Sequence, residues 1–190
     1  MTAIPTIFPE VYLLKPKVIQ DKRGSLSEYF LSQAFQSAIG RKILFCQENL
    51  TYSKKAVLRG LHYQLPLFAQ SKLVSVIQGN VLDVVVDIRK GSPSFGKYFS
   101  QELSAENQLQ IFIPRGFAHG FITLSETSLF HYKTDQYYHP ESEGHIAAND
   151  LELGIDWKIP EKEWIQSEKD KMHPTLAKAS VFDFKDDLYA

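Results

Sequence analysis

The sequence predicts an all-β fold, either a β-sandwich or a barrel, on two observations. Short runs rich in β-branched and aromatic residues recur along the chain at regular spacing, and turn residues separate them. Helical patterns are sparse. No repeat, low-complexity stretch or linker divides the 190 residues, so we expect one domain over residues 1–190 with a barrel core at about 40–135.

Each strand prediction follows from a β-rich run that turn residues bound. The candidate turns are Gly79-Asn80, Gly91–Pro93, Ser104–Asn107 and Pro114–Gly116. The expected strands are Val11–Leu14, Ile43–Ser53, Lys72–Gln78, Val81–Arg89, Tyr98–Leu103, Leu109–Ile113, Phe117–Leu124 and Ser128–Thr134. Helix-like patterns occupy only Leu31–Ala38 and Glu161–Lys171, so the fold should contain few and short helices.

The run KLVSVIQGNVLDVVVDIR predicts a β-hairpin with Gly79-Asn80 as its two-residue turn. In that register Lys72 lies opposite Asp87, and Lys72, Asp83 and Asp87 share one face with several valines. The other face is almost entirely apolar. A valine-rich face that holds a lysine and two carboxylates is more typical of a small-barrel interior than of a solvated surface. A slip of one residue would undo this pairing.

Composition excludes several classes of protein. The formal net charge of −1 argues against a strongly basic nucleic-acid-binding protein, so no nucleic-acid partner is expected. No apolar run is long enough to span a membrane, and the proline-interrupted N-terminus lacks the basic region of a signal peptide. Cys46 is the only cysteine, which rules out an internal disulfide and favours a reducing, cytoplasmic compartment.

The candidates for chemistry are histidine, lysine, tyrosine, arginine and acidic residues, because phosphate-loop, GxGxxG, GxSxG and CxxC motifs are all absent. His62 lies in LRGLHYQ and His119 in IPRGFAHGF. Two histidines in a barrel raise the possibility of a metal site, but Gln64 stands where a His-x-His motif would place its second ligand. A lone histidine is more often a core or surface residue with a satisfied hydrogen bond.

Other candidates also have plain structural alternatives. Tyr132 could simply fill the barrel. Arg23 and Arg59 each precede a glycine and could bind phosphate or remain on the surface. The run Ser167–Asp170 looks like a solvated charged segment.

Taken together, several segments resemble the dTDP-4-dehydrorhamnose 3,5-epimerase family, in the same order and over about residues 10–175. They are DKRG, FCQEN, LRGLHYQ, QSKLVSVIQGNVLDVVVDIRKGSPSFG, IPRGFAHGF, FHYKTDQYY and SEKD. The sequence departs from the family pattern at Leu26, at Ala147–Leu151, at His131 and at Gln136. None of these departures removes a residue of the expected catalytic set.

The resemblance implies a cupin-type jelly-roll β-barrel that forms a homodimer and uses neither a metal nor another cofactor. The implied substrate is a dTDP-linked 4-keto-6-deoxyhexose, whose carbons 3 and 5 are inverted to give dTDP-4-dehydro-L-rhamnose. Inversion of carbon 3 alone, or action on a related keto sugar, remains an alternative. A metal-dependent barrel enzyme using His62 and His119, and a binding module without catalysis, are more distant ones.

The resemblance also implies roles for individual residues. His62 would be the base, Asp170 its carboxylate partner, Lys72 the cation that stabilises an enolate oxygen, and Tyr132 the acid on the opposite face. These roles match the demands of the chemistry, since a proton beside a ketone is weakly acidic. The residues expected to bind substrate are Arg23, Glu28, Gln47, Asn49, Arg59, His119, Tyr138, Glu143 and Lys169.

Overall fold

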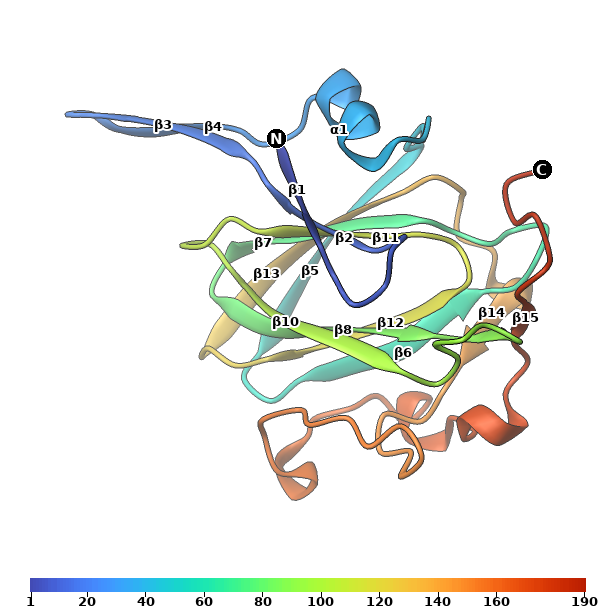
Figure 1. Ribbon diagram of the computed structural model, residues 1–190. Coiled ribbons are helices and arrows are strands. Elements are labelled where there is room, and N and C mark those ends of the chain that lie inside the picture. Colours follow the sequence, from blue (N-terminus) through green and yellow to red (C-terminus); the bar gives the residue numbers. More distant parts are fainter.

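Two antiparallel sheets face each other and enclose the barrel interior (Figure 1). The computed structural model describes residues 1–190. The six-stranded sheet has the order β1 (Thr2–Pro5), β2 (Tyr12–Lys15), β11 (Gln110–Ile113), β7 (Lys72–Gln78), β13 (Thr127–Thr134), β5 (Gln47–Lys54). The five-stranded sheet has the order β10 (Tyr98–Ser104), β8 (Asn80–Asp87), β12 (Phe117–Thr123), β6 (Leu58–Gln64), β14 (Glu143–His145). The expected all-β jelly roll is confirmed.

The predicted hairpin over residues 72–89 is wrong. β7 pairs with β11 and β13, whereas β8 pairs with β10 and β12, so the two strands belong to opposite sheets. Gly79 makes the corner at φ +76°, and a Cβ there would lie 2.1 Å from the backbone oxygen of Thr127. A glycine-asparagine pair therefore carries the chain from one sheet to the other instead of turning it back on itself.

The alternation of side chains within each strand nevertheless holds. One interior cluster contains Val74 and Val76 of β7 together with Val81 and Val85 of β8. The alternate residues point outward on the two separate sheets: Leu73 packs under the α-helix, and Leu82 packs under the C-terminal segment. Lys72 and Asp83 thus face the same interior from opposite sheets.

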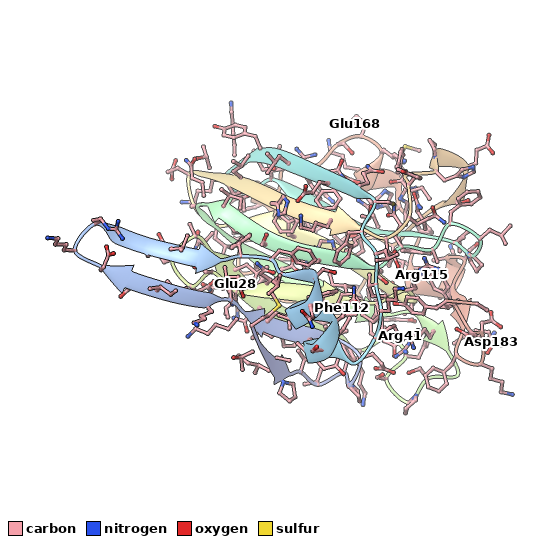
Figure 2. All side chains as sticks on the ribbon, turned by 90° about the horizontal axis from the view of Figure 1, so that it is seen from above. Glu28, Arg41, Phe112, Arg115, Glu168 and Asp183 are labelled. Atoms are coloured by element: carbon pink, nitrogen blue, oxygen red, sulfur yellow. The ribbon has the colours of Figure 1, made fainter.

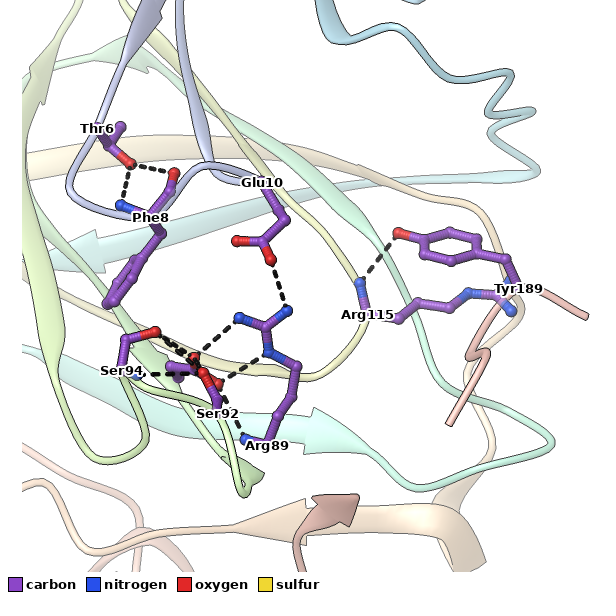
Figure 3. Close-up of polar contacts among 9 residues, drawn as sticks. Thr6, Phe8, Glu10, Arg89, Ser92, Ser94, Arg115 and Tyr189 are labelled. Atoms are coloured by element: carbon purple, nitrogen blue, oxygen red, sulfur yellow. Dashed lines mark hydrogen bonds and ion pairs between the residues drawn. The ribbon is translucent and has the colours of Figure 1, made fainter. Parts of the chain in front are cut away.

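The third polar residue of that face, Asp87, lies at one end of β8 and is fully buried. It accepts hydrogen bonds from Arg89, Ser92 and Ser94. Arg89 also donates to Glu10, and Figure 3 shows this pair together with Ser92 and Ser94. Asp87 therefore ties the turn after β8 to the N-terminal segment instead of contributing to the cavity described below.

The helix expected at residues 31–38 is confirmed as α1 (Ser32–Ile39), which covers the outer face of the six-stranded sheet with Phe35 and Ile39. The helix expected at Glu161–Lys171 is wrong. Only the 3₁₀ turns η2 (Glu161–Glu163) and η3 (Asp170–Met172) form there, and Ile165 between them makes backbone hydrogen bonds with Ala56 and Leu58. The backbone pairing to the barrel overrides the weak helical pattern.

The C-terminal segment covers the outer face of the five-stranded sheet. It contributes Ile146, Leu153, Trp157, Leu176 and Phe182 to a cluster with that sheet, and burial of each such side chain stabilises the fold by about 1.5–3 kcal/mol. The remaining short elements are η1 (Pro140–Ser142), η4 (Leu176–Lys178), β9 (Arg89–Lys90) and β15 (Phe182–Asp183). Because it runs along this sheet, the segment brings residues that are distant in sequence close to the barrel interior.

A hairpin of β3 (Lys17–Asp21) and β4 (Gly24–Glu28) projects away from the barrel (Figures 1 and 2). Asp21 pairs with Gly24, and the Asp21 carboxylate accepts hydrogen bonds from the backbone and side chain of Arg23, which closes the turn. The cross-strand pair Ile19 and Leu26 is 54% and 69% exposed. The hairpin therefore carries apolar side chains that this chain does not cover.

α1 has eight residues, and no helix in the structure combines the length and apolar character needed to cross a membrane.

Candidate active site

A β-bulge in β6 directs two functional side chains into the barrel. His62 lies opposite His119 of β12, whereas Arg59 lies opposite Phe121, so two residues of β6 face the single residue Gly120. Gly60 and Gly120 let β6 and β12 approach closely at this point, since a Cβ on Gly60 would lie 2.6 Å from the Cα of Gly120. The extra residue places Arg59 and His62, three positions apart, on the same inward face.

His62 forms a short hydrogen bond with a carboxylate that is distant in sequence. Its Nε2 lies 2.7 Å from Oδ1 of Asp170. The Asp170 side chain is only 8% exposed. Burial acts to raise the pKa of Asp170, but the hydrogen bond and charge of His62 outweigh burial and hold this pKa below its ordinary value. Asp170 is thus a carboxylate acceptor, which directs the Nε2 proton toward it and leaves the lone pair on Nδ1.

Lys72 and Tyr132 approach from the other sheet, on β7 and β13. Burial lowers the pKa of Lys72 to about 8, while the carboxylates of Glu143 and Asp83 act in the opposite direction. Burial also raises the pKa of Tyr132, against the nearby charge of Arg59. At neutral pH the phenol therefore keeps its proton.

These four side chains line one cavity of about 520 Å³. A cavity of this size is typical of small-molecule sites. The predicted residues that line it are Arg59, His62, Lys72, His119, Tyr132, Glu143, Lys169 and Asp170. His62 and Asp170 come from the five-stranded sheet and its covering segment, and Tyr132 comes from the six-stranded sheet. The imidazole and the phenol thus belong to opposite walls of the same cavity.

A second histidine–carboxylate pair lies deeper in the barrel. Nε2 of His119 is 2.8 Å from Oδ2 of Asp83, and these side chains are 7% and 0% exposed. Oδ1 of Asp83 has no hydrogen-bond partner. Asp83 comes from the neighbouring strand of the same sheet, and no local sequence pattern predicts its pairing with His119.

A polar chain extends from the cavity along its edge. Lys169 donates to Glu143, and the Tyr138 hydroxyl donates to the same carboxylate at 3.1 Å. The backbone N–H of Tyr138 donates to Gln47, whose side-chain amide donates to Asn49. The expected substrate residues Gln47, Asn49 and Tyr138 therefore lie beside the cavity through this chain, although they are not among its lining residues.

Arg23 and Glu28 lie apart from this group. Arg23 is at the tip of the projecting hairpin, with a side chain that is 84% exposed and paired only with Asp21. Figure 2 shows Glu28 at the end of the hairpin that joins the body of the molecule. Within one chain, neither residue lines the cavity.

Several residues that line the cavity or pack beside it are not predicted from the sequence. Thr51, Phe121, Phe130, Gln166 and Ser167 line the cavity. His145 of β14 lies opposite His62 in the sheet, and His173 follows η3. Burial lowers the pKa of His145 to about 4, and burial likewise lowers the pKa of His173. Period-two alternation through residues 117–121 could have indicated Phe121, but the histidine contacts depend on the pairing of β14 with β6 and on the path of the segment that follows it.

Comparison with known proteins agrees with this geometry. A sequence model of the family described as dTDP-4-dehydrorhamnose 3,5-epimerase matches residues 5–178. The chain is 50% identical over 182 residues to the dTDP-4-dehydrorhamnose 3,5-epimerase of Salmonella typhimurium, covering 94% of this chain and 97% of that protein. It is 46% identical over 182 residues to the Pseudomonas aeruginosa protein of the same name, covering 96% and 99%.

Two solved structures of sugar-nucleotide epimerases are also similar to this chain. The chain is similar to a dTDP-6-deoxy-D-glucose-3,5-epimerase from Legionella pneumophila in complex with dTDP-4-keto-L-rhamnose. The TM-score is 0.92 at 42% identity, and the match covers 97% of this chain and 99% of that one. A 3'-monoepimerase from Streptomyces bikiniensis in complex with dTDP-quinovose is also similar, with a TM-score of 0.84 at 31% identity over 93% of this chain and 88% of that one.

Proposed function

Because the chain belongs to the dTDP-4-dehydrorhamnose 3,5-epimerase family, we propose that it inverts carbons 3 and 5 of dTDP-4-dehydro-6-deoxy-D-glucose. The product is dTDP-4-dehydro-L-rhamnose. The observation that carries this proposal is one cavity lined by a histidine–carboxylate pair from one wall and a phenol from the other. We further propose that the whole chain, residues 1–190, acts as one epimerase domain without a metal or other cofactor.

In the proposed reaction, His62 removes the proton from a carbon beside the C4 ketone. The C–H electron pair becomes the second bond of an enolate, and the negative charge develops on the C4 oxygen. The imidazolium that forms is stabilised by the Asp170 carboxylate, which lies 2.7 Å away. The same base serves carbons 3 and 5, which both lie beside the ketone.

Lys72 and Tyr132 complete the proposed cycle. The Lys72 ammonium stabilises the enolate oxygen, and loss of one such donor typically costs roughly 2.7–4 kcal/mol of barrier. Tyr132 then gives its hydroxyl proton to the opposite face of carbon 5, which forms the new C–H bond with inverted configuration, while at carbon 3 solvent supplies the proton on that face. Proton exchange with water returns both residues to their starting states, so the reaction is a redox-neutral isomerisation. The protonated Tyr132 favours double inversion over inversion of carbon 3 alone.

The nucleotide part of the substrate needs cations for its two phosphates. Arg59 and Lys169 line the cavity, and Tyr138 offers an aromatic ring at the edge, 53% exposed, for the thymine. Glu143, which accepts from both Lys169 and Tyr138, fixes their positions. His119, Gln47 and Asn49 supply further polar groups for the sugar and the nucleotide.

We also propose that the enzyme is a homodimer in which the β3–β4 hairpin reaches the partner's cavity. Arg23 and Glu28 do not line the cavity of their own chain, and the exposed pair Ile19 and Leu26 lies on the same hairpin. β5 is an edge strand of the six-stranded sheet, with Leu50 and Tyr52 at 62% and 60% exposed. A second copy of the chain would cover both apolar surfaces.

A solvent deuterium experiment tests the proposed reaction. Purified, metal-stripped protein is incubated in D₂O with dTDP-4-keto-6-deoxyglucose, and label at carbons 3 and 5 is followed by NMR. We expect label at both carbons. Absence of label at either carbon would refute double epimerisation, and label at carbon 3 alone would identify a 3-epimerase.

Mixed dimers test the shared site. Arg23→Ala should raise KM by roughly tenfold or more, since a charge-assisted hydrogen bond is worth about 1.5–3 kcal/mol. If Arg23 acts on the partner's cavity, dimers of one Arg23→Ala chain and one His62→Ala chain contain one intact site. Co-expression with two affinity tags isolates these dimers. Recovery of low-KM activity supports the shared site, and no recovery contradicts it.

The cytoplasm is the proposed location, because Cys46 is a free, exposed thiol and sugar nucleotides are made inside the cell.

A further inference from the structure

Two histidines that the proposed reaction does not use pack against His62. The rings of His145 and His173 are stacked with centroids 4.4 Å apart. Each ring meets His62 edge-on, at 5.5 Å for His145 and 5.4 Å for His173. One ring nitrogen from each of the three lies within 4.8 Å of the others. Strand pairing positions this cluster, since His145 and His62 are opposite each other on β14 and β6.

The ring nitrogens of the two additional histidines are mostly unpaired. Nδ1 of His145 and both nitrogens of His173 are buried without a hydrogen bond. The His173 side chain is only 2% exposed, and its nearest charged group is Oδ1 of Asp170, 3.4 Å from Nε2. Buried polar atoms nearly always have partners, so these three buried nitrogens are available to coordinate an ion.

We propose that His62, His145 and His173 bind a divalent transition-metal ion of the zinc class, and that this ion inhibits the enzyme reversibly. Imidazole nitrogens are preferred ligands of zinc, cobalt and nickel, whereas magnesium and calcium prefer oxygen. Zinc–nitrogen bonds of about 2.0–2.1 Å require nitrogens about 3.3 Å apart in a tetrahedral site. The three nitrogens lie within 4.8 Å of one another, so binding requires the side chains to draw together around the ion.

The surroundings of the cluster suit a cation. Oδ1 of Asp170 lies 2.7 Å from Nε2 of His62, so a negative charge stands beside the site and orients one ligand, as carboxylates do for zinc-binding histidines. His62 lines the cavity and is 29% exposed, which gives an ion a route from solvent. The cluster therefore has ligands, a charge partner and an entry path.

Inhibition follows from the role of His62. A metal ion on that ring takes up the lone pair that would accept the substrate proton, and His62 is the one member of the cluster that lines the cavity. This step rests on the proposed function, but metal binding does not. The two are therefore measured separately.

Calorimetry with ZnCl₂ on chelator-treated protein measures binding without reference to activity. We expect one ion per chain with a micromolar Kd, and absorption bands of a four- or five-coordinate ion when Co²⁺ replaces zinc. His173→Gln and His145→Gln should each weaken zinc binding by about tenfold or more. His131→Gln is the matched control, because His131 is bound to Ser75 and Glu48 away from the cavity.

Binding outcomes decide the site directly. No stoichiometric ion in the parent protein would overturn the proposal. Equal zinc affinity in the parent, His173→Gln and His145→Gln proteins would also overturn it. Loss of affinity only in His131→Gln would assign the ion to a surface histidine.

The deuterium-exchange assay measures inhibition. Zinc should slow exchange by the parent protein, a chelator should restore it, and magnesium at the same concentration should have no effect. Whatever rate His173→Gln retains without metal, its inhibition should need about tenfold more zinc. If the metal-free parent shows no exchange, the proposed function fails while the binding result stands. Unchanged or faster exchange on zinc binding would overturn the inhibitory role.

Discussion

The two histidine–carboxylate pairs of the barrel have nearly the same bond and very different surroundings. His62 and His119 lie opposite each other on β6 and β12, and their Nε2 atoms are 2.7 and 2.8 Å from a carboxylate oxygen. Both histidines line the cavity, but the His62 side chain is 29% exposed, whereas that of His119 is 7% exposed and its partner Asp83 is fully buried. A short bond to a carboxylate therefore does not by itself identify the base. The greater exposure of the His62 side chain distinguishes it from His119.

The carboxylates also reach their histidines in different ways. Asp83 is part of β8, next to β12 in the same sheet, so strand pairing fixes the His119–Asp83 contact. Asp170 lies 108 positions from His62 in the sequence and reaches it through the C-terminal segment. There the backbone N–H of Asp170 donates to the Ser167 hydroxyl. In the His119–Asp83 pair, both residues lie on strands of one sheet. In the His62–Asp170 pair, the carboxylate comes from the C-terminal segment outside that sheet.

The largest expected effect comes from substitution of His62, in the more exposed of the two pairs. His62→Ala should lower exchange at carbons 3 and 5 by about 10⁴-fold, because one base serves both carbons. NMR detection of deuterium at each carbon measures the loss. His119→Ala is the matched comparison and should lose far less. If both variants lose activity equally, or if His62→Ala retains exchange at one carbon, the distinction between the pairs fails.

Lys72 sharpens the comparison, since its charge faces the cavity and lies near Asp83. Lys72→Met should lower kcat by about 10²–10³-fold through loss of enolate stabilisation. Because burial lowers the Lys72 pKa to about 8, the ammonium is present below that pH and is lost above it. The value of kcat/KM should therefore fall as pH rises through about 8.

Lys72→Arg provides the control for this pH dependence. A guanidinium stays charged throughout, so the fall near pH 8 should disappear even if the overall rate is lower. A profile in Lys72→Arg that falls at the same pH as the parent profile would assign the titration to another group.

Substitution of Tyr132 tests the proposed acid on the six-stranded sheet, opposite His62 and Asp170. Tyr132→Phe should lower exchange at carbon 5 by about 10²-fold and at carbon 3 by less, because it removes the proton donor while leaving His62 and Asp170 in place. The ratio of label at the two carbons is the measurement. Equal losses at both carbons would contradict the acid role.

The comparison also explains which features were predictable from sequence. Alternation correctly placed Lys72 and Asp83 on the inward faces of their strands, because it depends only on local extended backbone. It could not identify the neighbouring strand, since Gly79-Asn80 suits a corner between sheets as well as a hairpin. The Asp83 partner of His119 was missed for that reason, as it follows from the pairing of β8 with β12.

The contact between His62 and Asp170 could be predicted only through the family resemblance. Residues 167–170 look like a solvated charged run, yet Asp170 is buried against His62. Their position depends on how Ile165 pairs with the backbone beside β6, which replaces the helix expected there. The His173 contact depends on the same path, whereas His145 reaches His62 through the pairing of β14 with β6, and neither contact had a local signal.

The smallest effect on activity, and the largest difference in stability, should come from the buried pair. His119→Ala should reduce kcat by less than about tenfold but lower the free energy of unfolding by about 3–5 kcal/mol, because it leaves the Asp83 carboxylate buried without its partner. Denaturant unfolding measures this change. His62→Ala should cost less stability, since the cavity admits water to Asp170. Adding Asp83→Asn to His119→Ala removes the unpaired charge and should restore part of the loss. If the double variant is no more stable than His119→Ala, burial of the Asp83 charge is not what distinguishes this pair from His62 and Asp170.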